Sequence, residues 1–110
     1  MVDRLRVSVV NSPWFWALVA GILALGAALS ALQWGVNGSQ SPFATDVGEI
    51  QNALPRWGTI HFTGYPLYTF LGSCWVTFWR MVGVEPAAGS SLWSALWGAA
   101  AAALFALVAM

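Results

Sequence analysis

An uncharged apolar stretch near the N-terminus constrains this chain more than any other feature of its sequence. Residues 13–33 contain no Asp, Glu, Lys or Arg. A helix needs about 20 predominantly apolar residues to cross the roughly 30 Å of a bilayer's hydrocarbon core. The stretch therefore predicts a transmembrane helix, with Ser12 as its N-cap and Pro13 in its first turn. Trp14 and Trp34 lie near its two ends, which is typical of the aromatic belts at membrane interfaces.

A second uncharged stretch, residues 91–110, predicts another transmembrane helix. It is rich in Ala, and residues 99–103 are five alanines in a row. Together with Gly21 and Gly26 in the first stretch, these small residues favour close helix packing in lipid. The predicted fold class is therefore an all-α integral membrane protein with two transmembrane helices.

The composition excludes several other classes of protein. Of the 110 residues, 59% are hydrophobic and 7% are charged, and the formal net charge is zero. Soluble domains carry about 25% charged residues. Nucleic-acid binding requires a basic face, and intrinsic disorder requires low hydrophobicity with high charge. Cys74 is the only cysteine, so no disulfide can form within the chain. We therefore expect a lipid bilayer as the first partner of this chain, and no nucleic acid.

The residues that flank the first stretch predict its orientation. Arg4 and Arg6 precede it closely, and positive residues favour the cytoplasmic side of a membrane. Residues 1–12 are therefore predicted to form a cytoplasmic tail, and residues 34–90 to form an external loop. In a bacterial inner membrane this loop would face the periplasm or the outside of the cell.

The predicted external loop contains two amphipathic segments. Residues 46–54 are predicted to form a short helix that ends before Pro55, because the residue before a proline disfavours the α conformation. Residues 66–83 are predicted to form a longer helix that begins at Pro66. Its apolar face consists of Leu67, Phe70, Leu71, Cys74, Trp75, Phe78 and Val82, and its polar stripe of Thr69, Ser73, Thr77 and Arg80.

The polar stripe on the longer helix favours a helix that lies in the membrane interface or packs under other helices. Its length, about 18 residues, would also just suffice to span a bilayer. Cys74, on the apolar face, is expected to be a small buried hydrophobic residue.

Two acidic residues in the short helix have alternative interpretations. Asp46 and Glu49 are three positions apart and would be neighbours on the helix surface. They can form a capping box, with Asp46 as N-cap and Glu49 reaching back to it. They can also serve as a carboxylate pair that acts as a general base or binds a hard cation. His61 is the only histidine, so the residues themselves predict no transition-metal site.

The order of two short motifs indicates a family. Residues 46–49 read Asp-Val-Gly-Glu, and residues 61–68 read His-Phe-Thr-Gly-Tyr-Pro-Leu-Tyr. The chain resembles the N-terminal part of a GT-C-type membrane glycosyltransferase, in particular the bacterial family related to protein O-mannosyltransferases. The first external loop of that family has Asp-x-Gly-Glu followed by His-Pro-Pro-Gly-Tyr-Pro-Leu-Tyr. Phe62 and Thr63 stand where that family has its two prolines.

The resemblance implies sugar transfer from a polyprenyl-phosphate donor at the outer face of the membrane. By this analogy Asp46 would deprotonate or orient the acceptor, and Glu49 would support Asp46 or a bound divalent cation. His61 and Tyr65 would belong to the donor-binding site, with His61 near the lipid phosphate. The family builds its active site from many more spans than two, so we expect this chain to be inactive when alone.

A second hypothesis is that the chain is an accessory structural subunit of a larger membrane complex, such as a respiratory or photosynthetic one. Two helices bury little surface between them, so other membrane subunits are expected as partners. Under this hypothesis Gly21, Gly26 and the run of alanines would pack against those subunits.

Overall fold

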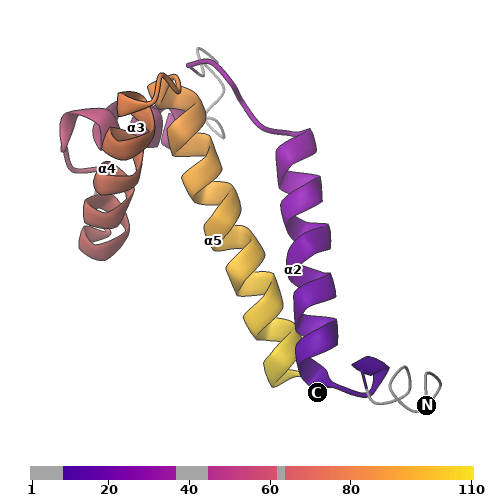
Figure 1. The fold of residues 1–110 in the computed structure, drawn as a ribbon. Coiled ribbons are helices and arrows are strands. Elements are labelled where there is room, and N and C mark those ends of the chain that lie inside the picture. The colour runs from indigo at the N-terminus through magenta and orange to yellow at the C-terminus, as the bar shows by residue number, and fades with distance from the viewer. Residues whose placement is uncertain (1–8, 37–44, 62–63) are drawn as a thin grey trace. The chain divides into compact units, whose positions relative to one another are not determined.

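The computed structural model describes residues 9–36, 45–61 and 64–110, and every regular element within these ranges is helical (Figure 1). The elements are the helices α2 (Pro13–Ser30), α3 (Thr45–Ala53), α4 (Pro66–Met81) and α5 (Pro86–Val108), with a short 3₁₀ helix, η2 (Leu54–Arg56), after α3. The predicted all-helical fold, in which two long apolar helices flank a segment with shorter ones, is confirmed. The contacts divide the chain into unit 1, Met1–Ala31 with Ala95–Met110, and unit 2, Leu32–Ser94.

Helices α2 and α5 are long and apolar enough to cross a membrane, and most of their surface is exposed within the chain itself. Helix α2 begins at Pro13 as predicted and ends at Ser30, three residues earlier than expected. Ser12 adopts the extended conformation of an N-cap, but its side chain makes no capping bond. These two possible membrane-spanning helices suggest a membrane location.

Helix α5 begins earlier than predicted, at Pro86 instead of residue 91. Proline fits the first turn of a helix, where its missing N–H costs no hydrogen bond. The Glu85 carboxylate accepts a hydrogen bond from the backbone N–H of Ala87 at 3.1 Å. The start of α5 at Pro86 thus follows the same rule as the start of α2 at Pro13.

In unit 1, small residues bring α2 and the C-terminal part of α5 together. A Cβ atom at Gly21 would lie 3.2 Å from Ala103 Cβ and 3.4 Å from the carbonyl oxygen of Ala99. Gly26 has no neighbour within 4 Å of the same position. The predicted close packing thus occurs at Gly21, and its partners belong to the same chain.

In unit 2, α4 and the first part of α5 form an antiparallel pair. The indole N–H of Trp75 donates to the carbonyl oxygen of Gly89 at 3.1 Å, and that of Trp93 donates to the carbonyl oxygen of Tyr68 at 3.3 Å. The earlier residue of α4, Tyr68, therefore contacts the later residue of α5, Trp93, as expected for helices that run in opposite directions. Gly83, at φ +89°, lies in the turn between the two helices, in the backbone region that glycine adopts most readily.

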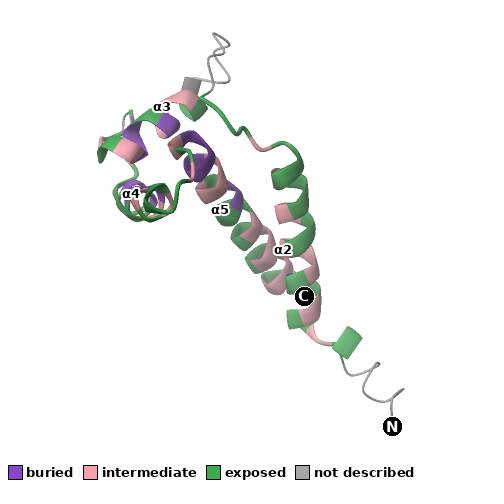
Figure 2. Cartoon of the chain, turned by 45° about the horizontal axis from the view of Figure 1, so that its top comes forward, coloured by how far each residue is buried: buried purple, intermediate pink, exposed green. Residues whose placement is uncertain are grey.

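The core of unit 2 lies where α3, η2, α4 and the start of α5 meet (Figure 2). Leu54 of η2 is 0% exposed and Val76 of α4 is 1% exposed. Its other buried residues are Gln51, Ala53, Ile60, Thr69, Gly72, Ser73, Ala87, Ala88, Gly89 and Ser90. This small core holds the shorter helices in place.

Helix α4 packs with Thr69 and Ser73 of its polar stripe inward. Its buried residues are Thr69, Gly72, Ser73 and Val76. The Thr69 hydroxyl is satisfied locally, because it donates to the backbone oxygens of Gly64 and Tyr65, each at 2.6 Å. Small residues on this side let the helix approach its neighbours closely, which explains why the less apolar face is the buried one.

Most of the apolar face of α4 points outward, and Trp75 is the exception because it packs against α5. Leu67 is 67% exposed and Phe70 is 59% exposed. Cys74 is exposed as well, so the expectation of a buried cysteine is wrong. The physical reason is that large side chains on this face would hold the helices apart, whereas Gly72 and Ser73 do not.

We predict that Gly72→Ala destabilises the packing of α4. A Cβ at residue 72 would lie 2.7 Å from Trp93 Nε1 and 3.0 Å from Leu54 Cδ1. Overpacking of this kind costs about 1–3 kcal/mol. The measurement is the free energy of unfolding of the reconstituted chain in a denaturant titration. Gly98→Ala is the matched control, because residue 98 of α5 has open space around it. An equal loss in both variants would contradict the packing argument.

Candidate functional site

The candidate site combines α3 with the segment that precedes α4. Asp46 is the second residue of α3, and Glu49 follows it by about one turn. A carboxylate in the first turn of a helix is favoured by the positive end of the helix dipole. Asp46 lies inside the helix and not before it, so it is not the N-cap that the capping-box interpretation required.

A sharp reversal of the chain brings His61 back to α3. Pro55 lies in η2, where the α-helical hydrogen-bonding pattern has ended. Trp57 then adopts a left-handed conformation with φ 56°. The backbone N–H of Gly58 donates to the carbonyl oxygen of Ala53 at 2.9 Å and closes the turn. The following residues therefore return alongside the helix they have just left.

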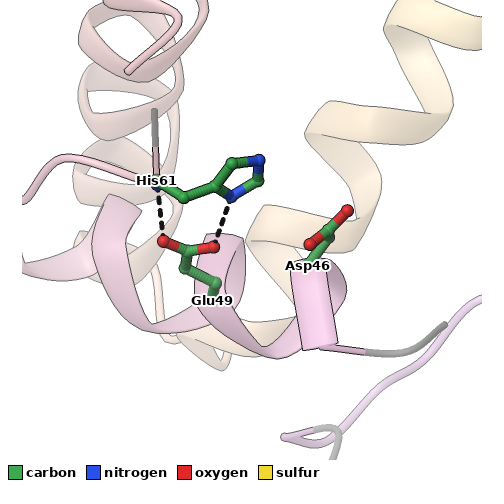
Figure 3. A group of neighbouring side chains, drawn as sticks. All are labelled: Asp46, Glu49 and His61. Atoms are coloured by element: carbon green, nitrogen blue, oxygen red, sulfur yellow. Dashed lines mark hydrogen bonds and ion pairs between the residues drawn. The ribbon is translucent and has the colours of Figure 1, made fainter. Parts of the chain in front are cut away.

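Glu49 binds His61 through both of its carboxylate oxygens (Figure 3). Oε1 accepts the backbone N–H of His61 at 2.6 Å, and Oε2 lies 2.7 Å from the imidazole Nδ1. An ionised carboxylate can only accept hydrogen bonds, so Nδ1 must carry the proton. The carboxylate of Glu49 thus binds a residue 12 positions away, where the capping-box interpretation had it reach back to the start of the helix.

Asp46, Glu49 and His61 together present three possible metal ligands within 4.8 Å of one another. Two carboxylate oxygens and an imidazole nitrogen form a donor set that suits several divalent cations. Both oxygens of Glu49 already accept hydrogen bonds from His61. A cation coordinated by Nδ1 of His61 would displace the Nδ1 proton and break this pairing, so the geometry as it stands is that of a hydrogen-bonded pair with a neighbouring carboxylate.

The pairing changes the acidity of both partners. The hydrogen bond with Glu49, and then the negative charge of Glu49, raise the pKa of His61 above its usual 6.5. The same hydrogen bond lowers the pKa of Glu49 below its usual 4.5. Both shifts favour the charged forms, so His61 is protonated over a wider pH range than an isolated histidine.

A cavity of about 310 Å³ opens beside this pair. It is lined by Asp46, Ile50, Ile60, His61, Tyr65 and Tyr68. The rings of His61 and Tyr65 meet edge to face, with their centres 6.3 Å apart. Three of the four predicted site residues, Asp46, His61 and Tyr65, thus line one cavity. Glu49 is not among the lining residues, and its carboxylate binds His61.

Sequence reasoning missed Tyr68 as part of the cavity. Its hydroxyl group lies 2.8 Å from Ser94 Oγ, which ties it to α5. Tyr68 lies in the first turn of α4, three positions after Tyr65, the left-handed residue that precedes this helix. This spacing was the available signal.

Comparison with known proteins identifies one family. The model of the family described as the protein O-mannosyl-transferase TMEM260 N-terminal domain matches residues 46–110. The matched segment contains every residue that lines the cavity, as well as Glu49. No curated protein and no solved structure matches the chain.

We predict that the pairing of Glu49 and His61 stabilises the fold most between about pH 4.5 and pH 6.5. The raised pKa of His61 gives stability that is complete below 6.5 and is lost as the pH rises through the raised value. The lowered pKa of Glu49 gives stability that is complete above 4.5 and is lost as the pH falls through the lowered value.

The measurement is the difference in unfolding free energy between the wild type and His61→Gln as a function of pH. This difference should be largest between pH 4.5 and 6.5 and should shrink on both sides. A difference that does not vary with pH would show that the imidazole contributes no charge pairing.

Proposed function

Because the chain belongs to the family of the TMEM260 N-terminal domain, we propose that it supplies part of the active site of a membrane-bound protein O-mannosyltransferase. In this proposal a mannosyl group passes from a polyprenyl-phosphate donor to a hydroxyl group of a protein. The observation that carries the proposal is the cavity in which Asp46, His61 and Tyr65 meet, which lies wholly within the matched segment.

Asp46 acts as the general base in this reaction. The acceptor hydroxyl gives its proton to the Asp46 carboxylate while its oxygen attacks the anomeric carbon of the sugar. The bond between that carbon and the phosphate oxygen breaks, and the phosphate leaves on its lipid. A base in hydrogen-bonding reach of the acceptor contributes about 10²–10⁴-fold to such a step. The exposed position of Asp46 on the cavity wall leaves room for an acceptor beside it.

His61 and Tyr65 form the donor side of the cavity. An imidazolium group can donate a charge-assisted hydrogen bond to a phosphate oxygen, both in the bound donor and in the departing lipid phosphate. The Tyr65 ring stands against the His61 ring and forms the adjoining wall. The acceptor would bind beside Asp46, and the donor beside His61 and Tyr65. The two reactants would thus lie next to each other, in position for an in-line displacement.

The proposal requires further membrane helices, from the same polypeptide or from another. The long hydrocarbon tail of a polyprenyl phosphate needs an apolar channel, and within the described residues only α2 and α5 are candidates to cross a membrane. The shorter helices would lie at the non-cytoplasmic face of the membrane, because Arg4 and Arg6 predict that the N-terminus is cytoplasmic.

An accessory structural role is the second candidate function, and the exposed apolar surface of the long helices favours it. Leu18 and Leu23 of α2 and Phe105 of α5 are all exposed within the chain. Lipid or other subunits can cover such residues. Subunits that bind to the long helices would not depend on Asp46. The two functions therefore differ in what a change at Asp46 does.

We predict that Asp46→Asn, in the complete membrane-embedded enzyme, lowers mannosyl transfer by about 10²–10⁴-fold, because the amide cannot take up the acceptor proton. The measurement is incorporation of labelled mannose into an acceptor protein, with the assembly state followed by native mass spectrometry. Glu85→Gln is the matched control, because Glu85 contacts the start of α5 and lies outside the cavity. Unchanged transfer by Asp46→Asn would reject the catalytic role and favour the accessory one.

A further inference from the structure

Glu49 stands behind the cavity wall and not in it. Both of its carboxylate oxygens bind His61, one at the backbone N–H and one at the imidazole Nδ1 (Figure 3). His61 lines the cavity and Glu49 does not. Any effect of Glu49 on a bound molecule would therefore pass through His61.

We propose that Glu49 is a positioning residue that holds His61 as an imidazolium, with its Nε2–H available to an anionic phosphate in the cavity. This inference rests on the proposed function, since the phosphate is that of the lipid-linked donor. It assigns Glu49 to the donor side of the site, whereas the family resemblance paired it with Asp46 or with a cation.

The two-point contact fixes the orientation of the ring. The backbone bond at 2.6 Å holds the main chain of His61 against α3, and the Nδ1 bond at 2.7 Å limits rotation of the imidazole. With Nδ1 committed to Glu49, Nε2 is the one ring nitrogen left to meet a ligand. A carboxylate behind a histidine orients the ligands of metal sites in the same way, and the same logic applies to a phosphate.

The charges around the cavity make His61 the natural anion contact. Of the six residues that line it, His61 is the only one with a basic side chain. The titratable groups that face it are Asp46 and Glu49 from α3, and Tyr65 and Tyr68 at the start of α4. Burial raises the pKa of Tyr68, so this phenol stays neutral.

The two carboxylates affect the cavity differently. The hydrogen bond with Glu49 is the main cause of the raised pKa of His61, and Asp46 adds a smaller contribution. Without Glu49, a phosphate in the cavity would lie near the negative charge of Asp46 and near a histidine that is protonated over a narrower pH range. The negative charge of Glu49 thus strengthens anion binding at the cavity, because it acts through a cation that it keeps charged.

The single histidine of the chain allows a direct test. We would label the 110-residue chain with ¹⁵N-histidine, reconstitute it in phosphatidylcholine nanodiscs and follow the imidazole nitrogens by NMR as the pH is changed. In the wild type, the neutral ring should carry its proton on Nδ1. Glu49→Gln should lower the titration midpoint of His61, and Glu49→Asp, which keeps the charge, should restore part of it.

The matched control is Glu85→Gln, which makes the same chemical change at a carboxylate that contacts Ala87 instead of His61. It should leave the His61 midpoint unchanged. Glu49→Asp also guards against a loss of folding in Glu49→Gln, and circular dichroism of each variant checks helix content.

Ligand binding is tested with two probes, a polyprenyl phosphate incorporated in the nanodiscs and inorganic phosphate in solution. Near pH 7, polyprenyl phosphate should shift the Nε2 signal of the wild type, and Glu49→Gln should weaken its binding by about three- to tenfold because a charge-assisted hydrogen bond is weakened. His61→Gln should abolish binding. Binding of inorganic phosphate with the same Glu49 dependence would support recognition of the phosphate group alone.

The outcomes separate the inference from the function beneath it. If Glu49→Gln leaves both the midpoint and the affinity unchanged while His61→Gln abolishes binding, the positioning role is overturned and the donor site stands. If the wild-type chain binds neither probe, and the complete membrane-embedded enzyme does not bind them either, the donor site and the positioning role both fall. The transfer activity of Asp46→Asn is independent of either result.

Discussion

The pair of hydrogen bonds that His61 donates to the Glu49 carboxylate is the contact on which the candidate site depends. It joins two segments that are 12 residues apart and defines one wall of the cavity next to Asp46. Because the pair includes a backbone N–H, it also holds the main chain at His61 against α3. A side-chain bond alone would leave the main chain at His61 free to move, and the cavity would lose the alignment of Asp46 with His61.

The packing beneath the site depends on small residues. Gly72 allows the indole of Trp93 and the side chain of Leu54 to meet at the surface of α4. The Trp93 indole then donates to the backbone of Tyr68, next to the cavity. The same close approach turns the apolar face of α4 outward, where lipid or further helices of a larger enzyme would cover it. The outward apolar face agrees with the two helices of this chain that are long and apolar enough to cross a membrane.

Much of the fold follows from local patterns. Uncharged length predicted the two long helices, and Pro13, Pro55 and Pro66 marked the start or end of helices as expected. The relation to protein O-mannosyltransferases could also be inferred from the sequence, because each of the two motifs is an unbroken stretch of residues. One prediction failed because it assumed that the apolar face of α4 is covered within the chain: Cys74 on this face is exposed. In a chain with an apolar environment, close packing of small residues decides instead which face is buried.

The sequence by itself determined the all-helical class, the two candidate spans and the residue types of the site. The tertiary structure alone decided which of these residues act together. Asp46 and Glu49 are equal neighbours on a helix by spacing, yet only Asp46 lines the cavity, while Glu49 binds His61. The physical reason is the reversal at Trp57, which returns the chain to α3. A left-handed residue in a turn has no periodic signal, so the partner of Glu49 cannot be deduced from spacing.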